Sequence, residues 1–209
     1  MMMPDAYTIT ATLREGATLA LYRGVRQRDG TPVVIKAFRA ELPGPRQVER
    51  LRYEYELVRR LDSPYLLKAY ELDQQKAQVR LILEDFDGDP LACQLDRPME
   101  AGRFLDIALP LAAALADIHR QDIVHKDLKP ANILIQPQAG AVKLTGFGIA
   151  ARLVHAPTAL TSVSLIEGSL AYMSPEQTGR MNRGIDHRSD LYSLGVIFYE
   201  MLTGELPFQ

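Results

Sequence analysis

The sequence predicts an α+β fold in two parts, a strand-rich first part and a helical second part. Two observations support this prediction. Short segments rich in β-branched residues fill much of residues 7–86, and long stretches of helical spacing lie in residues 87–209. The chain of 209 residues is long enough to bury a core in one domain or in two small lobes. We therefore expect one lobe over residues 1–86, a second over residues 87–209 and a cleft between them.

The first part begins with strands. Residues 7–38 are predicted as strands, and Asp29-Gly30 is a typical hairpin turn within them. After this turn, residues 33–38 are rich in β-branched side chains, which favour a strand. The sequence Pro43-Gly44-Pro45 then breaks the chain.

A helix and two more strands complete the first part. From residue 47 to residue 61, the apolar side chains recur at helical spacing, at Val48, Leu51, Tyr55, Val58 and Leu61. Ser63-Pro64 ends this helix. Residues 66–72 and 79–83 are predicted as strands.

The second part is dominated by helical patterns. Residues 104–120 have one apolar face and predict a long helix, which Pro110 should kink because proline removes a hydrogen bond. Short strands are predicted at residues 133–135 and 142–144. A last helix is predicted over residues 190–202.

Composition and charge exclude several classes of protein. The net charge is −2 and no run of basic residues occurs, so we expect no nucleic-acid partner. The longest apolar run, residues 107–116, is about half of the ~20 residues that a membrane helix needs, so we expect no membrane partner. Cys93 is the only cysteine, which rules out an internal disulfide and favours a reducing, cytoplasmic location.

The segment His125-Lys126-Asp127-Leu128-Lys129-Pro130-Ala131-Asn132 has the residue types that phosphoryl transfer needs. Asp127 offers a carboxylate to orient a hydroxyl group. Lys129 offers an ammonium group near the moving phosphate, and Asn132 offers an amide oxygen for a metal ion. The next segment, Lys143-Leu144-Thr145-Gly146-Phe147-Gly148, should contain a metal-binding aspartate in the pattern Asp-Phe-Gly. The residue at the position of that aspartate is Gly146.

With these motifs in this order, the chain resembles a eukaryotic-type serine/threonine protein kinase domain from about Tyr7 to its C-terminus. The segment Ser174–Arg183 resembles the N-terminal kinase domains of large bacterial hybrid signalling proteins, in which an ATPase module and a sensor histidine kinase follow. The resemblance implies a two-lobed protein-kinase-like fold with one key helix in the N-lobe. The C-lobe would be incomplete, because the pattern stops after the helix near Asp190. Such a chain would be a fragment, a truncated gene product or a unit that needs a partner.

The resemblance also assigns roles in the N-lobe. Lys36 resembles the lysine that holds the α- and β-phosphates of ATP. Glu54 resembles the glutamate that pairs with that lysine, and Glu56 is a rival on a different side of the helix. In the phosphate-covering loop only Gly16 of the family glycines is present. It is therefore open whether this loop contacts phosphate or is a plain hairpin.

The remaining roles lie in the linker and the C-lobe. The backbone of Glu84 and Phe86 would bind adenine. Asp127 resembles the residue that accepts or orients the substrate hydroxyl proton, and Lys129 the residue that steadies the γ-phosphate. Asn132 resembles a metal ligand. The implied small molecules are ATP and Mg²⁺, and the implied partner is a protein substrate or signalling partner.

Gly146 stands where the resemblance implies a metal-binding aspartate, so phosphoryl transfer by this chain is in question. Glycine offers no ligand, and no other carboxylate lies between Asn132 and Arg152, so Mg²⁺ binding should be weakened or lost. A loss of ~4 kcal/mol of metal-mediated stabilisation would slow the reaction about a thousandfold. The sequence therefore leaves three alternatives: an active kinase, a pseudokinase that binds nucleotide or protein, and a gene remnant. Candidate phosphosites in the loop after this motif are Thr158, Thr161, Ser162 and Ser164.

Overall fold

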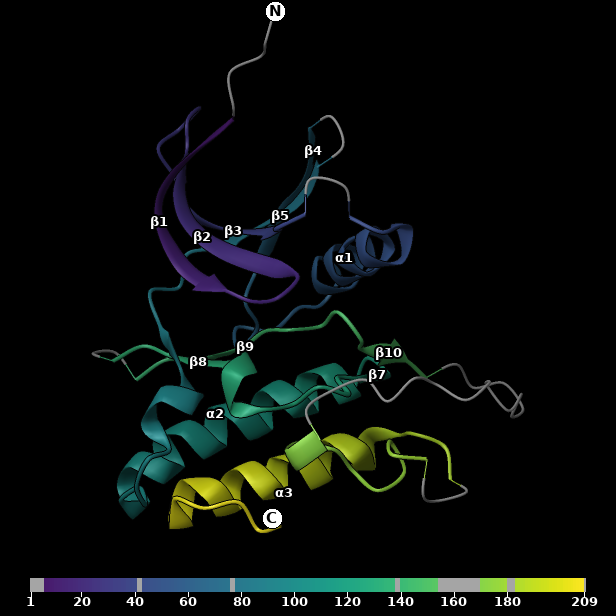
Figure 1. Cartoon of the computed structure of the whole chain (residues 1–209). Helices are drawn as coiled ribbons and strands as arrows, with labels where there is room; N and C mark the ends of the chain where they lie inside the picture. The colour runs from purple at the N-terminus through teal and green to yellow at the C-terminus, as the bar shows by residue number, and fades with distance from the viewer. Residues whose placement is uncertain are drawn as a thin grey trace, which may run out of the picture. The chain divides into compact units, whose positions relative to one another are not determined.

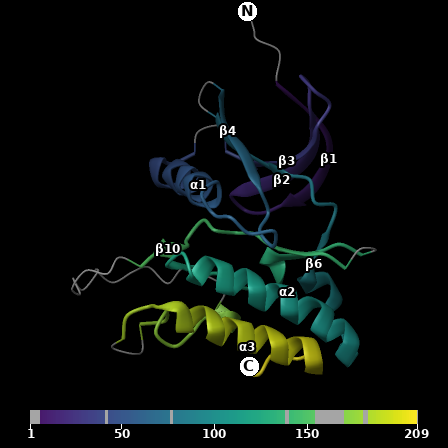
Figure 2. The same ribbon diagram turned by 180° about the vertical axis from the view of Figure 1, so that it is seen from behind.

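The computed structural model describes residues 6–40, 43–75, 78–137, 140–153, 170–179 and 183–208. The chain divides into two compact units. Unit 1 consists of Met1–Arg60 and Leu67–Asp87, and unit 2 consists of Leu61–Leu66 and Gly88–Gln209. Figure 1 labels the helices and most of the strands of both units, and Figure 2 labels β6. The predicted α+β fold, with strands concentrated in the first part of the chain, is confirmed.

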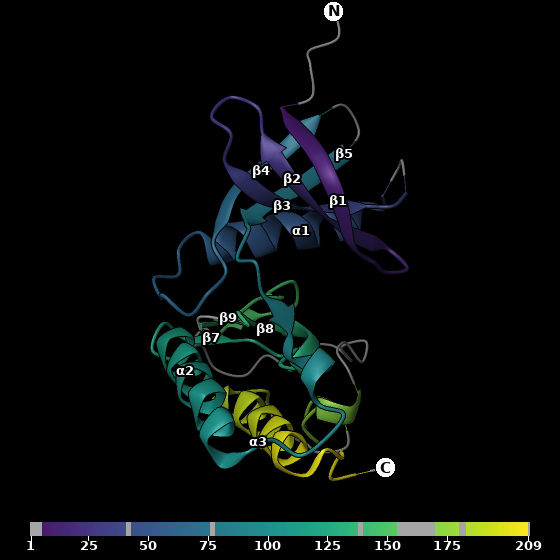
Figure 3. The same ribbon diagram turned by 90° about the vertical axis from the view of Figure 1, so that its left-hand side faces the viewer.

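Unit 1 is a five-stranded antiparallel sheet with one helix. The strand order is β1-β2-β3-β5-β4. The helix α1 contacts β4 and β5, as Figure 3 shows. The bounds are β1 Tyr7–Glu15, β2 Leu19–Arg26, β3 Pro32–Phe38, α1 Pro45–Val58, β4 Ala69–Gln75 and β5 Gln78–Glu84. All the strands and the helix that the sequence predicts in this part are therefore present.

The helix α1 starts and ends slightly earlier than predicted. Pro45 lies in its first turn, where proline costs no hydrogen bond, and the Gln47 side chain accepts a hydrogen bond from the backbone N–H of Gly44 at 2.9 Å. The helix ends at Val58 rather than Leu61. Leu51, Glu54 and Val58 form its buried stripe.

Unit 2 contains two long helices, α2 (Ala101–His119) and α3 (His187–Thr203), which lie side by side in Figures 1 and 2. Its strands form two small sheets, in the orders β6-β8-β9 and β10-β7. The bounds are β6 Asp89–Pro90, β7 Ile123–Val124, β8 Ile133–Ile135, β9 Val142–Leu144 and β10 Ala151–Arg152, with short 3-10 turns η1 Leu91–Gln94, η2 Pro130–Asn132 and η3 Leu170–Tyr172. The predicted strands at residues 133–135 and 142–144 are confirmed.

Both long helices begin before the predicted residue because a polar side chain caps each one. Glu100 accepts a hydrogen bond from the N–H of Gly102 at the start of α2, and Asp186 accepts one from the N–H of Arg188 at the start of α3. The helix α2 continues through Pro110. None of the described helices combines the length and apolar character that a membrane crossing requires.

Candidate active site

In unit 1, Lys36 on β3 forms an ion pair with Glu54 on α1. The Nζ atom of Lys36 donates to both carboxylate oxygens of Glu54, at 2.9 and 2.7 Å. Glu54 is only 4% exposed because it lies in the buried stripe of α1. Glu56 is half exposed and contacts Arg59 and Arg60 at 3.5 Å. The geometry therefore makes Glu54, and not Glu56, the partner of Lys36.

The β1–β2 hairpin turns at Gly16. Its N–H donates to the carbonyl of Leu19 at 2.9 Å, and its own carbonyl accepts from the Arg39 guanidinium at 3.2 Å. A Cβ atom at residue 16 would lie 3.0 Å from the Leu19 oxygen, so any larger residue would crowd this turn. The turn itself thus accounts for this glycine, and phosphate contact at Gly16 stays a prediction.

The linker predicted to bind adenine follows β5 in unit 1. The N–H of Glu84 donates to the carbonyl of Lys68 at 2.9 Å, and Phe86 is buried. Arg23 on β2 forms an ion pair with Asp85 at 2.9 Å, which holds the linker against the sheet. Adenine recognition by this backbone stays a prediction.

In unit 2, the side chains of Asp127, Lys129 and Asn132 meet in the loop between β7 and β8. The Lys129 Nζ atom lies 3.0 and 2.8 Å from the two carboxylate oxygens of Asp127. The Asn132 amide nitrogen donates to the backbone carbonyl of Asp127 at 2.8 Å and to its carboxylate at 3.1 Å. The structure therefore brings together the three loop residues that the sequence predicts for catalysis.

The backbone before Asp127 is anchored by Asp190 of α3, which is 1% exposed. The Asp190 carboxylate accepts hydrogen bonds from the N–H groups of His125 and Lys126, at 2.8 and 2.9 Å. It also lies 2.8 Å from Nε2 of His119 on α2. A buried carboxylate is stable only when such donors surround it. Two helices thereby fix the start of the loop, and neither the sequence pattern of α2 nor its spacing pointed to His119.

The ring of His125 links the loop to the segment after β9. Its Nε2 atom lies 3.0 Å from the backbone carbonyl of Thr145, which can only accept, so the ring carries its proton on Nε2. The Nδ1 atom then accepts from the N–H of Asp127 at 3.3 Å. The ring also packs edge-on against Phe147, with centroids 4.7 Å apart.

Gly146 has a backbone conformation that depends on glycine. Its φ is +88°, and a Cβ atom there would lie 2.6 Å from both Cγ and the amide nitrogen of Asn132. The amide of Asn132 thus lies where a side chain at residue 146 would begin.

The described segment that follows Asn132 offers no carboxylate to a magnesium ion. Magnesium prefers oxygen ligands, usually including one or two carboxylates. Residues 133–153 contain no aspartate or glutamate, and Asn132 is turned onto Asp127. Within the described ranges there is also no group of three or more His, Cys, Asp or Glu side chains that could hold a metal ion.

The chain from Leu170 onward packs on α3. The pKa of Tyr172 is raised, mainly because the side chain is buried. The hydrogen bond that its hydroxyl donates to Glu200, at 2.8 Å, raises this pKa further. Burial also raises the pKa of Glu176, but the hydrogen bonds it accepts, one of them from Ser189 at 2.6 Å, outweigh burial and leave this pKa below its ordinary value. The predicted phosphosites lie outside the described residues: Thr158, Thr161, Ser162 and Ser164.

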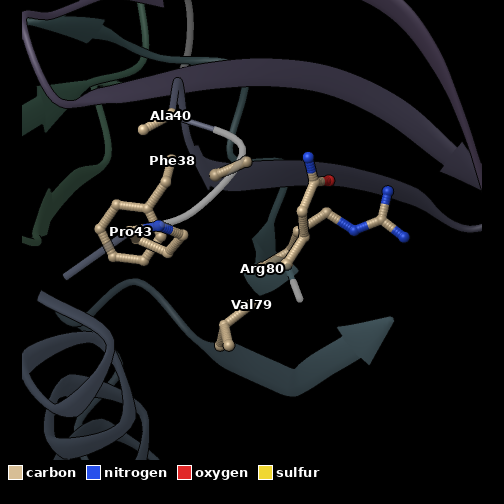
Figure 4. A pocket seen from close by; sticks show the side chains of 7 residues that line it. Phe38, Ala40, Pro43, Val79 and Arg80 are labelled. Carbon is tan, nitrogen blue, oxygen red and sulfur yellow. The ribbon is translucent and has the colours of Figure 1, made fainter. Parts of the chain in front are cut away.

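Unit 1 also contains a small hollow, shown in Figure 4, at the end of β3 and the start of β5. Arg80 in its wall pairs with Asp73 at 2.6 Å. None of the predicted site residues lines it; the lining residues are Ala37, Phe38, Ala40, Pro43, Gln78, Val79 and Arg80.

Comparison with known proteins identifies the family of this chain. Residues 7–209 match the family described as "Protein kinase domain". The chain is 36% identical over 210 residues to the serine/threonine-protein kinase PknL of Mycobacterium bovis, covering 99% of this chain and 51% of that protein. It is 35% identical over 207 residues to the serine/threonine-protein kinase Pkn1 of Myxococcus xanthus, covering 97% of this chain and 29% of that protein. The chain spans about half the length, or less, of these curated relatives. It belongs to the protein kinase family, as a kinase domain of the eukaryotic serine/threonine type.

Proposed function

We propose that this domain transfers the γ-phosphoryl group of ATP to a serine or threonine hydroxyl of a protein. Members of its family generally use ATP and Mg²⁺ and act on proteins. The observation that supports the proposal best is the loop in which Asp127 contacts both Lys129 and Asn132. These contacts place a carboxylate, an ammonium group and an amide within one hydrogen-bonded cluster, as phosphoryl transfer requires.

In the proposed mechanism each residue has one task. Asp127 orients the substrate hydroxyl and receives its proton, because a carboxylate accepts hydrogen bonds. Lys129 offsets the negative charge of the transferred phosphoryl group. In the N-terminal lobe, Lys36 binds the phosphates of ATP, and Glu54 holds the Lys36 ammonium in place through the 2.7 Å ion pair.

The other assignments are also proposals. Gly16 would lie in the loop over the phosphates, and the backbone of Glu84 and Phe86 would bind adenine. We propose lobes over residues 1–86 and 87–209 and a cytoplasmic location. Further modules would belong to a larger natural protein, consistent with relatives that extend beyond the region matched here.

A second candidate function is a pseudokinase that binds nucleotide or a protein partner without efficient transfer. The observation that favours it is Gly146, which provides no carboxylate and leaves room for the Asn132 amide. With this function, the domain would act in signalling by binding a nucleotide or a protein partner, and not by transferring phosphate.

ATP should stabilise the protein against thermal unfolding. At 100 times its dissociation constant, ATP should add ~2.7 kcal/mol to the free energy of unfolding. The shift should occur without Mg²⁺, because residue 146 is a glycine and offers no carboxylate through which Mg²⁺ would strengthen ATP binding. Lys36→Met should remove most of the shift, whereas Lys68→Met, at an exposed lysine of the same unit, should retain it. No shift for the wild-type protein would contradict ATP binding and, with it, the proposed phosphoryl transfer.

Asp127→Asn should lower any phosphorylation of a generic basic protein at least about a hundredfold, because the amide cannot receive the hydroxyl proton. Transfer of labelled phosphate is the measurement. Asp96→Asn, at an exposed aspartate away from the loop, is the control and should leave the rate unchanged. Activity that survives Asp127→Asn would come from a contaminating kinase.

A further inference from the structure

The residue immediately before Asp127 has a strained backbone. Lys126 has φ +66°, in the left-handed region that residues other than glycine avoid at a cost of roughly 1–2 kcal/mol. Such a conformation persists only when the surroundings hold it in place. Asp190 holds the N–H of Lys126, at 2.9 Å. The carbonyl of Lys126 must be held separately, because no atom of Asp190 can donate to it.

Gln177 holds that carbonyl. Its amide nitrogen donates to the backbone oxygen of Lys126 at 2.7 Å, across 51 residues of sequence. Gln177 lies in the turn that begins at Ser174, within the segment whose resemblance to bacterial hybrid kinases is described above. The contact therefore joins the end of the activation segment to the peptide bond that leads into Asp127.

The orientation of the Gln177 amide is fixed by its partners. Its oxygen accepts from the N–H of Ser174 at 3.2 Å and from the Ser174 hydroxyl at 3.1 Å. Ser174 is fully buried. Because the backbone N–H of Ser174 can only donate and the carbonyl of Lys126 can only accept, the amide has one consistent orientation. The site thus needs a side chain that donates at one atom and accepts at the other.

Few side chains meet this requirement. An ionised glutamate has the same length but only accepts, and a lysine only donates. Asparagine has the right groups but is shorter by one methylene. The site needs a side chain of this length that both donates and accepts a hydrogen bond, and glutamine meets both needs. This requirement follows from the contacts at the two ends of the Gln177 amide.

We propose that Gln177 is a positioning residue for Asp127. Through the carbonyl of Lys126, it holds the peptide group between the strained residue Lys126 and Asp127, and so orients the Asp127 carboxylate. The shape of the catalytic loop then depends on the turn at residues 174–179. The inference rests on the proposed role of Asp127 in phosphoryl transfer. Loss of the Gln177 contact would free the peptide group on the C-terminal side of Lys126, while Asp190 still holds the peptide group on its N-terminal side.

Hydrogen exchange tests this role without relying on activity. In Gln177→Met, which keeps the length of the side chain, exchange of the backbone amides in residues 124–129 should rise about tenfold, the effect of losing one hydrogen bond. Exchange in the middle of α2 should stay the same. The control is Thr178→Val, which removes a 2.7 Å bond to the carbonyl of Pro175 within the same turn but no bond to the loop.

Gln177→Glu isolates the single bond to Lys126. At about pH 7 the ionised carboxylate cannot donate, so loop exchange should again rise about tenfold over wild type at the same pH. Near the ordinary glutamate pKa of about 4.3 the protonated carboxyl regains a donor, and the ratio to wild type should fall back towards one. A residue that only stabilised the fold would change exchange in α2 to the same extent at each pH, whereas we expect the pH-dependent rise only in residues 124–129. If Gln177→Met does not fold, Gln177→Glu still tests whether Gln177 positions the loop.

Two results would overturn the proposal: unchanged exchange in residues 124–129, or an equal rise in α2, which would mean that Gln177 only stabilises the fold. If transfer is measurable, kcat should fall in Gln177→Met with the KM for ATP unchanged. If no variant transfers phosphate but the exchange pattern is as expected, the proposed function fails and the positioning of the loop stands.

Discussion

Gly146→Asp is expected to raise the rate of phosphoryl transfer about a thousandfold and to make nucleotide binding depend on Mg²⁺. The new carboxylate would supply the oxygen ligand that residues 133–153 lack. Restoring ~4 kcal/mol of metal-mediated stabilisation of the transition state corresponds to this gain. Labelled phosphate transfer and ATP-induced thermal shifts, each with and without Mg²⁺, measure the two effects.

The gain requires Asn132 to move. A Cβ atom at residue 146 would lie 2.6 Å from the Asn132 amide, so the amide must leave its bonds to Asp127 at least in part. Asp tolerates the left-handed conformation at φ +88° better than most residues do. We therefore expect Gly146→Asp to be about 1–2 kcal/mol less stable than the wild type in the absence of ligand.

Two matched variants separate the carboxylate from its bulk. Gly146→Asn has nearly the same shape without the charge, and Gly146→Ala adds only the Cβ atom. Both should show the loss of stability without the gain in rate. If Gly146→Asp folds, binds ATP and still transfers no phosphate, the missing carboxylate is not the only defect, and the pseudokinase function is favoured.

Asp190→Ala is expected to cost about 3–5 kcal/mol of stability, the largest effect on folding among the changes considered. The substitution leaves the N–H groups of His125 and Lys126 and the ring of His119 without their buried acceptor. Each donor left unsatisfied costs about 1–3 kcal/mol. Unfolding by urea, followed by circular dichroism, measures the loss.

The control for this change lies on the same helix. Asp186→Ala removes the cap of α3, which is worth about 1 kcal/mol. Its effect should therefore be several times smaller than that of Asp190→Ala. Equal losses in the two variants would mean that the buried bonds to the catalytic loop contribute little to stability.

The elements with strong local signals were predictable from the sequence. The run of β-branched residues identified β3, and the helical spacing of apolar side chains identified α1. Helical spacing places Glu54 and Glu56 on different sides of α1, but the choice of Glu54 came from the resemblance to protein kinases, and the structure shows that Glu54 is the buried one. The short strands β8 and β9 were predicted with their observed bounds.

Other features depend on contacts between distant residues and have no local signal. The two-residue strands β7 and β10 are too short for any periodicity. The bond from Gln177 to Lys126 spans 51 residues, and that from His119 to Asp190 spans 71. The position of the Asn132 amide depends on the backbone at Gly146, which the sequence motif alone does not specify.

Because Asp190 anchors the catalytic loop, the loop cannot reach its final structure until α3 has been synthesised. His125 leaves the ribosome 65 residues before its acceptor on α3. At about 5–20 residues per second, the loop would wait roughly 3–13 s for that acceptor. During this interval its N–H groups can bond only to water or to temporary partners. The nascent chain therefore completes its candidate catalytic centre late, after α2 and the sheet of unit 1 have been synthesised.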